Sequence, residues 1–232
     1  MSYCRLCKQF DCMMKQERVF SGLCLNLSLT QDWFGGEKHS PEIAQLIRFA
    51  KRGVPVCVAS RGDLALALRY LNHSSAGGFV DEIADKIRDD VKFGRAFVLP
   101  REAAARIPGM RVSPLAVTKS STKLRVVHDL TFSSGPSTIG VNEDTDFSSA
   151  STCELGHELR DIIWRIMYLW HQFGRGARIV LRKMDVKNVF RQVLVEITRA
   201  PVFGHVFGGL VVVDRRLQFG WRNSLCFWCL FT

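Results

Sequence analysis

The sequence lacks any long hydrophobic run. None reaches the roughly 18 to 20 apolar residues that a membrane-spanning helix needs. Residues 1–23 also lack the basic-then-apolar layout of a secretory signal peptide. These absences exclude a single-span membrane protein and predict an intracellular protein, of cytoplasm or nucleus, with no membrane partner. The apolar fraction is 47%, which is enough for a hydrophobic core and too high for a disordered tail.

The charge is strongly positive and unevenly distributed. The chain has 32 Lys and Arg against 22 Asp and Glu, a net charge of +10. Residues 1–100 carry a net +3, whereas residues 101–232 carry a net +7. Basic surfaces attract phosphate backbones by releasing counterions. The second half is therefore the better candidate for contact with a polyanion.

The lead, residues 1–40, is rich in cysteine. In an intracellular protein, cysteines are more typical of reduced thiols or metal ligands than of disulfides. Thiolates for Zn²⁺ could come from Cys4, Cys7, Cys12 and Cys24. Structural zinc sites usually contain two close pairs, and only Cys4 and Cys7 have that spacing. The sequence therefore leaves two predictions for the lead. It either binds zinc, or it is a disordered segment with free thiols.

Residues 41–100 have the pattern of a small helical module with three amphipathic helices. The first is expected to begin after Ser40, where a proline occupies the first turn. The second is expected to begin at Ser60, with Asp63 as its capping partner. The third has apolar residues four positions apart and should end at Gly94.

Residues 101–232 predict an α+β domain that is built on an antiparallel sheet. Two alternating segments are expected to form a hairpin with basic residues near its tip. Arg215 and Arg216 should form a basic turn after the last strand. The expected elements are strands at 115–119 and 123–130, a helix from Ser151 to about Gly174, and strands at 178–186 and 203–213.

Two carboxylates in this half lie next to apolar strands. Asp185 follows an apolar run, where a charge is costly unless it meets a cation or water. Spacing alone leaves two interpretations, an ion pair with Lys183 or Lys187 and a functional carboxylate. Asp214 precedes the basic turn and is expected to form an exposed ion pair there.

Three segments are similar, in the same order, to successive blocks of retrotransposon-type reverse transcriptases, which are RNA-directed DNA polymerases. They are residues 123–130 (KLRVVHDL), 183–192 (KMDVKNVFRQ) and 217–224 (LQFGWRNS). In that family the blocks are a fingers strand, the palm motif with the first catalytic Asp, and a Phe-Gly motif. Three ordered blocks are more specific than any one of them. The resemblance implies a partial right-hand polymerase, with fingers and the first half of the palm, that binds an RNA template, a DNA primer and a deoxynucleotide.

The resemblance also implies roles for single residues. Asp185 would be the catalytic carboxylate and a ligand of two Mg²⁺ ions, with the Val186 carbonyl as a second ligand. Phe190 would be the aromatic gate that selects deoxynucleotides. Basic side chains of the fingers would reach the triphosphate, where a guanidinium binds phosphate oxygens in pairs. The nucleotide-binding residues implied in this way are Lys119, Lys123, Arg125, Phe190, Gly220 and Arg222.

One block of the family is missing from the 232 residues. An aromatic-x-Asp-Asp hairpin, which carries the other two metal carboxylates, should follow the Phe-Gly motif. A lone Asp185 is expected to hold the catalytic Mg²⁺ pair poorly. The sequence therefore predicts a truncated reverse transcriptase of a transposable element that is inactive alone. The alternative is a non-catalytic remnant that binds nucleic acid.

Overall fold

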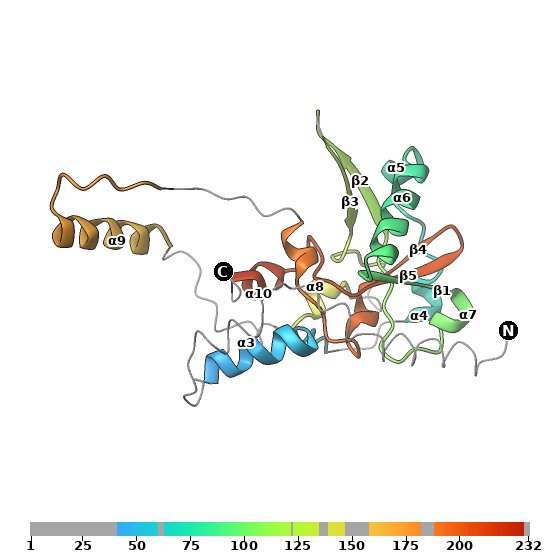
Figure 1. Cartoon of the computed structure of the whole chain (residues 1–232). Coiled ribbons are helices and arrows are strands. Elements are labelled where there is room, and N and C mark those ends of the chain that lie inside the picture. The colour runs from blue at the N-terminus through green and yellow to red at the C-terminus, as the bar shows by residue number, and fades with distance from the viewer. Residues whose placement is uncertain are drawn as a thin grey trace.

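The computed structural model describes residues 41–59, 63–121, 123–134, 139–146, 158–181 and 188–229. These residues combine helices with two antiparallel sheets (Figure 1), so the predicted α+β class is confirmed. No helix in these ranges is long and apolar enough to cross a membrane. Several predicted ligands lie outside the described residues, namely Cys4, Cys7, Cys12, Cys24, Asp185 and Val186.

Helices dominate the first part of the described chain. They are α3 (Pro41–Arg52), α4 (Leu64–Ala67), α5 (Ser74–Gly77) and α6 (Val80–Lys92). The first and third predicted helices are confirmed as α3 and α6. The start predicted for the second, Ser60, lies outside the described residues, and the helix that is described there, α4, is a single turn that begins after Asp63. The Asp63 carboxylate accepts a hydrogen bond of 3.0 Å from the Leu66 N–H, as an N-cap does.

Three strands form the larger sheet, which has the order β1-β5-β4. They are β1 (Ala96–Pro100), β4 (Gly204–Phe207) and β5 (Leu210–Asp214). The single strand predicted at 203–213 is wrong, because two glycines turn the chain there. Gly208 and Gly209 have φ angles of +57° and +79°, as a tight hairpin turn requires. The domain boundary at residue 100 stays a prediction, although β1 and β5, on either side of it, pair.

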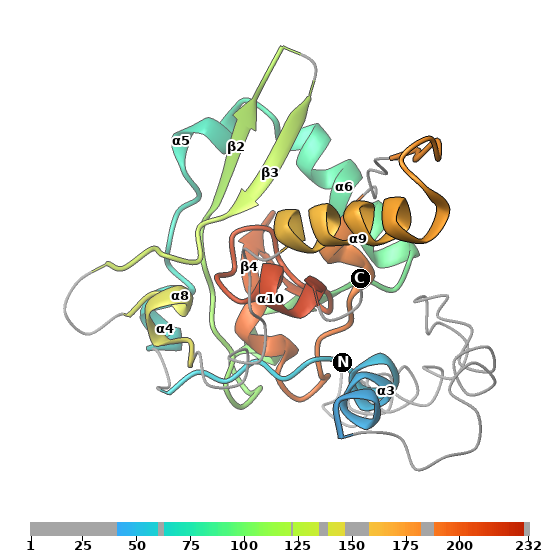
Figure 2. The ribbon, with the colours of Figure 1, turned by 90° about the vertical axis from the view of Figure 1, so that its left-hand side faces the viewer.

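The smaller sheet is the hairpin of β2 (Leu115–Lys119) and β3 (Leu124–His128), and it confirms the prediction. Figure 1 and Figure 2 show the hairpin extending away from the larger sheet, with α5 and α6 beside it. Leu115 and Val117 are buried on its inner face against Ile83 of α6. The hairpin and α6 are therefore packed together.

The main hydrophobic core packs against the larger sheet and contains several aromatic side chains. The Trp221 ring stacks on Phe227 with 5.7 Å between centroids, and Phe203 meets the same indole edge-on at 5.4 Å. Arg111 and Asp144, both buried, form an ion pair of 2.6 Å at the edge of the core. The short elements around the core are α7 (Arg101–Ala104), α8 (Val141–Asp144), η3 (Val189–Gln192), η4 (Ala200–Phe203) and α10 (Ser224–Cys229).

Helix α9 (Glu158–Phe173) ends just before Gly174, as predicted. Figure 1 shows it standing away from the other described elements. The predicted capping residue, Ser151, lies outside the described residues. The strand predicted at 178–186 is wrong where it is described, because Val180 and Leu181 are exposed and form no ladder. An apolar segment is not stable as a strand unless a neighbouring strand pairs with it.

Candidate functional site

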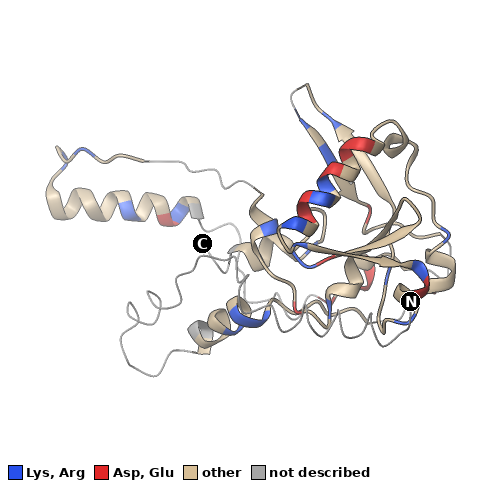
Figure 3. Cartoon of the chain, turned by 45° about the vertical axis from the view of Figure 1, so that its right-hand side comes forward, with Lys and Arg blue, Asp and Glu red and all other residues tan. Residues whose placement is uncertain are grey.

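A cavity of about 790 Å³ opens between the hairpin and the larger sheet. Its walls are β3, α6 and the short helix η3, and we define its floor as the lining residues of β4 and β5 together with Asp90, His128 and Arg191. Figure 3 shows acidic and basic segments alternating along α6 and basic segments on the hairpin. Charged walls and a partly apolar interior make this cavity the candidate functional site.

The cavity brings together three residues that the sequence assigned to nucleotide binding. Lys123, just before β3, and Arg125, in β3, line it and are both exposed. Phe190 lines it from η3 and is partly buried. The Phe190 ring lies 6.0 Å from the Phe219 ring, centroid to centroid. The wall at β3 is thus basic, and the wall at η3 contributes an aromatic side chain.

The other three predicted residues do not line this cavity. Lys119 lies on the hairpin, where its ammonium group is 5.9 Å from the centre of the Phe79 ring. Gly220 and Arg222 are tied to Asn142, whose side chain donates to the Gly220 carbonyl at 2.8 Å and accepts from the Arg222 N–H at 3.0 Å. Roles for these three residues in nucleotide binding stay predictions.

An ion-pair network forms the deep part of the cavity. The Arg191 guanidinium donates to Asp90 of α6 at 2.5 Å and to Asp214 of β5 at 2.7 Å. Burial alone would lower the pKa of Arg191, but the attraction of Asp214 and Asp90 outweighs burial and raises that pKa. Asp90 also lies within 3.6 Å of Lys86 and 3.5 Å of Arg95. The floor acids are therefore matched by cations.

The exposed ion pair expected for Asp214 is wrong. Asp214 is 2% exposed, because it ends the central strand of the sheet and faces the cavity floor. The basic turn expected after it is also wrong, since Arg216 is 4% exposed and donates to the Gln192 carbonyl at 3.1 Å. A carboxylate at a strand end can face inward or outward, and its sequence neighbours do not decide which.

Two buried histidines complete the floor. His128 ends β3, His205 lies in β4, and their ring centroids are 4.3 Å apart. The Asp214 Oδ2 atom lies 3.2 Å from His128 Nε2 and 3.8 Å from His205 Nδ1. Burial, aided by Arg191 and Lys86, lowers the pKa of His128 to about 3. Burial and the neighbouring His128 lower the pKa of His205 as well. Both imidazoles are therefore neutral at pH 7.

Because both histidines are neutral in the folded protein, we expect the free energy of unfolding to fall in mild acid. In the unfolded chain they protonate near the ordinary pKa of 6.5, whereas in the fold His128 stays neutral until about pH 3. The stabilisation is complete above pH 6.5 and is lost as pH falls. Each histidine contributes a slope of up to about 1.4 kcal/mol per pH unit.

Urea unfolding at pH 7.5 and pH 5.0 checks this prediction. We expect a lower free energy of unfolding at pH 5.0 and a smaller pH difference in His205→Gln. Equal stability at both pH values would contradict the buried, neutral state of the histidines.

Sequence reasoning missed most of this floor. His128 lies inside one of the aligned blocks, but nothing in its neighbours marks it as a partner of Asp214. The available signal was polarity inside strands, because His205 interrupts an apolar run and Asp214 ends one. Such residues are buried only when a partner or a site accounts for them.

The described residues do not form a site for Mg²⁺. Mg²⁺ prefers oxygen ligands in an octahedral shell, and the clustered ligands here include two imidazoles. The residues implied by the resemblance, Asp185 and Val186, lie outside the described part of the chain.

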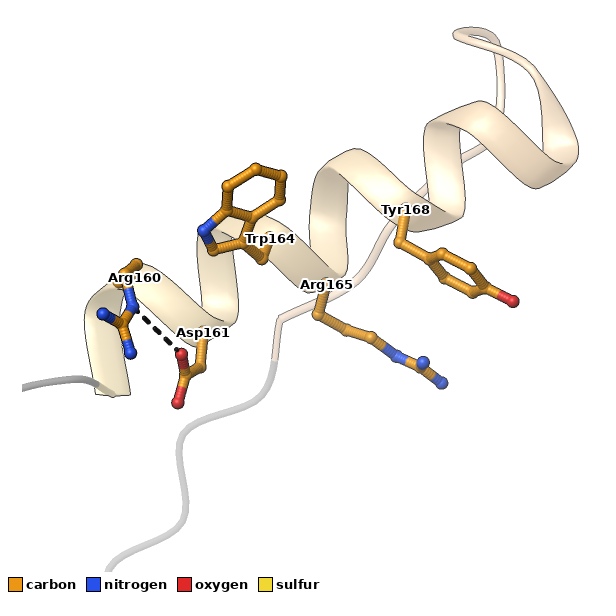
Figure 4. Close-up of a pocket in the computed structure, with 5 residues that line it drawn as sticks. All are labelled: Arg160, Asp161, Trp164, Arg165 and Tyr168. Carbon is orange, nitrogen blue, oxygen red and sulfur yellow. Dashed lines mark hydrogen bonds and ion pairs between the residues drawn. The ribbon is translucent and has the colours of Figure 1, made fainter. Parts of the chain in front are cut away.

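Another hollow on the surface is lined by residues of helix α9 alone. Figure 4 shows its five residues, all on the single helix: Arg160, Asp161, Trp164, Arg165 and Tyr168. Arg160 pairs with its neighbour Asp161 at 3.4 Å, and both side chains are exposed. Because no other described element contributes to it, this hollow is less suited to enclose a ligand.

Fold and cavity together define an α+β protein with a charged cavity between a projecting hairpin and a three-stranded sheet. No family model and no curated protein matches the chain. Among solved structures, it is similar to "the foamy viral protease-reverse transcriptase dRH in complex with ds DNA", with a TM-score of 0.46 and 17% identity over 75% of this chain and 24% of that chain. It is also similar to the foamy viral protease-reverse transcriptase in complex with dsDNA, with a TM-score of 0.43 and 18% identity over 73% and 28%. The chain thus spans about a quarter of the length of these proteins.

Proposed function

We propose that this chain is a fingers-and-palm piece of a retroelement reverse transcriptase that binds nucleic-acid phosphates in the charged cavity. We further propose that it does not extend a primer by itself. The observation that carries the proposal is the meeting of Lys123, Arg125 and Phe190 in one cavity. The resemblance assigned these residues to one nucleotide site, although they come from separate segments.

The chemistry of the cavity suits a phosphate-bearing ligand. Arg125 can bind phosphate oxygens in pairs through its guanidinium, and Lys123 supplies a second cation just before the same strand. Asp90 and Asp214 are both paired with Arg191, and Asp90 also lies near Lys86 and Arg95, so the two acids oppose an anion less. An aromatic ring such as Phe190 can pack on a sugar or base beside those phosphates.

Salt-dependent binding tests this proposal. An RNA–DNA primer–template should bind the chain with an affinity that falls steeply as salt rises. The double variant Lys123→Ala, Arg125→Ala should reduce the slope of log K against log salt by about 0.7 to 0.9 for each lost phosphate contact. Fluorescence anisotropy at several salt concentrations measures both slopes.

The matched control is the double variant Arg69→Ala, Arg88→Ala, which also removes two exposed charges but none that lines the cavity. Its slope should stay within error of the unchanged chain. Equal slopes for the two double variants would show that binding depends on total charge and would contradict a phosphate site in the cavity.

Primer extension tests the second part of the proposal. The 232 residues contain no aromatic-x-Asp-Asp motif, so two of the family's three metal carboxylates are missing. We expect no Mg²⁺-dependent incorporation of deoxynucleotides by this chain. Incorporation that disappears in Asp185→Asn would contradict this expectation and would show that the chain itself is a polymerase.

A further inference from the structure

Three side chains of types that can bind a metal ion meet where the hairpin joins the larger sheet. His128, His205 and Asp214 are all buried, and one ligand atom from each lies within 4.8 Å of the others. They come from three different strands, so neither local sequence nor a shared helix face explains their meeting. Neither the resemblance to reverse transcriptases nor the proposed phosphate site gives these residues a role.

We propose that His128, His205 and Asp214 form a binding site for a transition-metal dication of the Zn²⁺ type. Imidazole nitrogens and one carboxylate oxygen are typical ligands of Zn²⁺. Tetrahedral bonds of about 2.1 Å place ligand atoms about 3.4 Å apart. The Asp214 Oδ2 atom lies 3.2 Å and 3.8 Å from the two histidine nitrogens, close to that separation.

The residues around these three side chains could orient them as ligands of a metal. Arg191 donates to the Oδ1 atom of Asp214, which orients the carboxylate and leaves Oδ2 facing the histidines. Metal-binding carboxylates are commonly held in this way by a second hydrogen bond. The positive charge of Arg191 opposes a dication, and it is offset by Asp214 and by Asp90, which Lys86 and Arg95 also approach.

The histidines also have unused capacity for bonding. The Nδ1 atoms of His128 and His205 are buried and have no hydrogen-bond partner. Buried polar atoms without partners are rare in folded proteins and call for an explanation such as an ion. A metal bound to His205 Nδ1 would provide one for that atom, whereas His128 faces Asp214 through Nε2 and its Nδ1 is not among the proposed ligand atoms.

The cavity gives the metal an entry path and an open position. All three ligands line the cavity, so an ion can reach them from solvent. Three protein ligands with a fourth position open to a cavity are typical of zinc sites that bind water or an anion. The site lies apart in sequence from Asp185 and does not depend on phosphate binding by Lys123 and Arg125.

Titration with Co²⁺, a coloured substitute for Zn²⁺, tests the site without nucleic acid. The full chain is titrated by visible absorption, and binding of Zn²⁺ is followed by calorimetry. We expect a tetrahedral Co²⁺ spectrum from nitrogen and oxygen ligands. His205→Gln and His128→Gln should weaken this binding by at least about 100-fold, since they remove a ligand. His73→Gln is the matched control, because His73 pairs with Asp129 and is not one of the three clustered residues, and it should bind as the unchanged chain does.

Zinc-edge X-ray absorption of the unchanged, zinc-loaded chain keeps the test decisive if a histidine variant fails to fold. The proposal expects imidazole and oxygen ligands at about 2.0 to 2.1 Å. A shell made only of sulfur at about 2.3 Å would place the metal on the lead cysteines and overturn the proposal. Absence of binding, or equal binding by His205→Gln and His73→Gln, would also overturn it.

Discussion

Replacing Arg191 with Met is expected to destabilise the protein by about 3 to 5 kcal/mol. Arg191 joins α6 to β5 by binding Asp90 and Asp214 at 2.5 Å and 2.7 Å. Met fills a similar volume but leaves the Asp214 charge buried without this cation. Removing one partner of a buried pair costs more than the pair itself contributes, because the remaining charge stays out of water.

Urea unfolding of Arg191→Met against the unchanged chain measures this cost. The control is Arg88→Ala, which removes an Arg–Asp pair of 2.5 Å whose side chains are 73% and 64% exposed. That exposed pair is expected to contribute less than about 1 kcal/mol. If the two variants lose the same stability, the Arg191 network does not hold the cavity floor together.

The second large effect is expected for Gly53→Ala, at about 3 kcal/mol or more, because strain and overcrowding act together. Gly53 has a φ of +92°, which favours glycine. A Cβ atom there would lie 2.4 Å from the Val195 carbonyl carbon and 2.5 Å from the Glu196 nitrogen. Those are backbone atoms of a segment that Val54 joins through hydrogen bonds of 2.8 Å and 2.9 Å. The substitution therefore pushes α3 and its following segment away from the core.

Gly94→Ala separates the two causes. Gly94 also has a positive φ, +63°, but a Cβ atom there meets nothing within 4 Å. It is expected to cost only the conformational strain, about 1 to 2 kcal/mol. Thermal or urea unfolding of both variants should show the larger loss for Gly53→Ala. An equal loss would contradict the close backbone contact at Val195.

The elements that the sequence predicted well are those fixed by local patterns. The hairpin of β2 and β3 follows from alternation of apolar and polar residues on both sides of a short turn. The helices α3 and α6 follow from apolar residues three and four positions apart, with end signals such as Gly94. Each of these signals lies within about a dozen residues, so one segment contains all the information.

The hairpin of β4 and β5 was predicted as one strand for a local reason. Its residues form an apolar run, and two glycines inside a strand are also compatible with a bulge. The structure shows both glycines with positive φ, which makes them the turn. Pairing of β5 with β1, more than a hundred residues earlier, then leaves β4 at the other edge.

The candidate site was predicted only in part, because its floor depends on contacts between distant segments. Lys123, Arg125 and Phe190 were found through the ordered blocks of the family resemblance. His205, Asp90 and Arg191 carry no local signal that they meet, since α6, η3 and β4 are brought together only by the packing of the whole fold. Asp214 was assigned to the surface because its arginine neighbours offered a simpler partner.

The central claim is that nucleic acid binds in the cavity between hairpin and sheet. Hydrogen–deuterium exchange of the full chain, with and without an RNA–DNA primer–template, tests this location directly. We expect slower exchange in peptides that cover residues 123–128 and 188–191, which line the cavity. Unchanged exchange in both segments, with protection confined to the exposed helix α9, would contradict the claim.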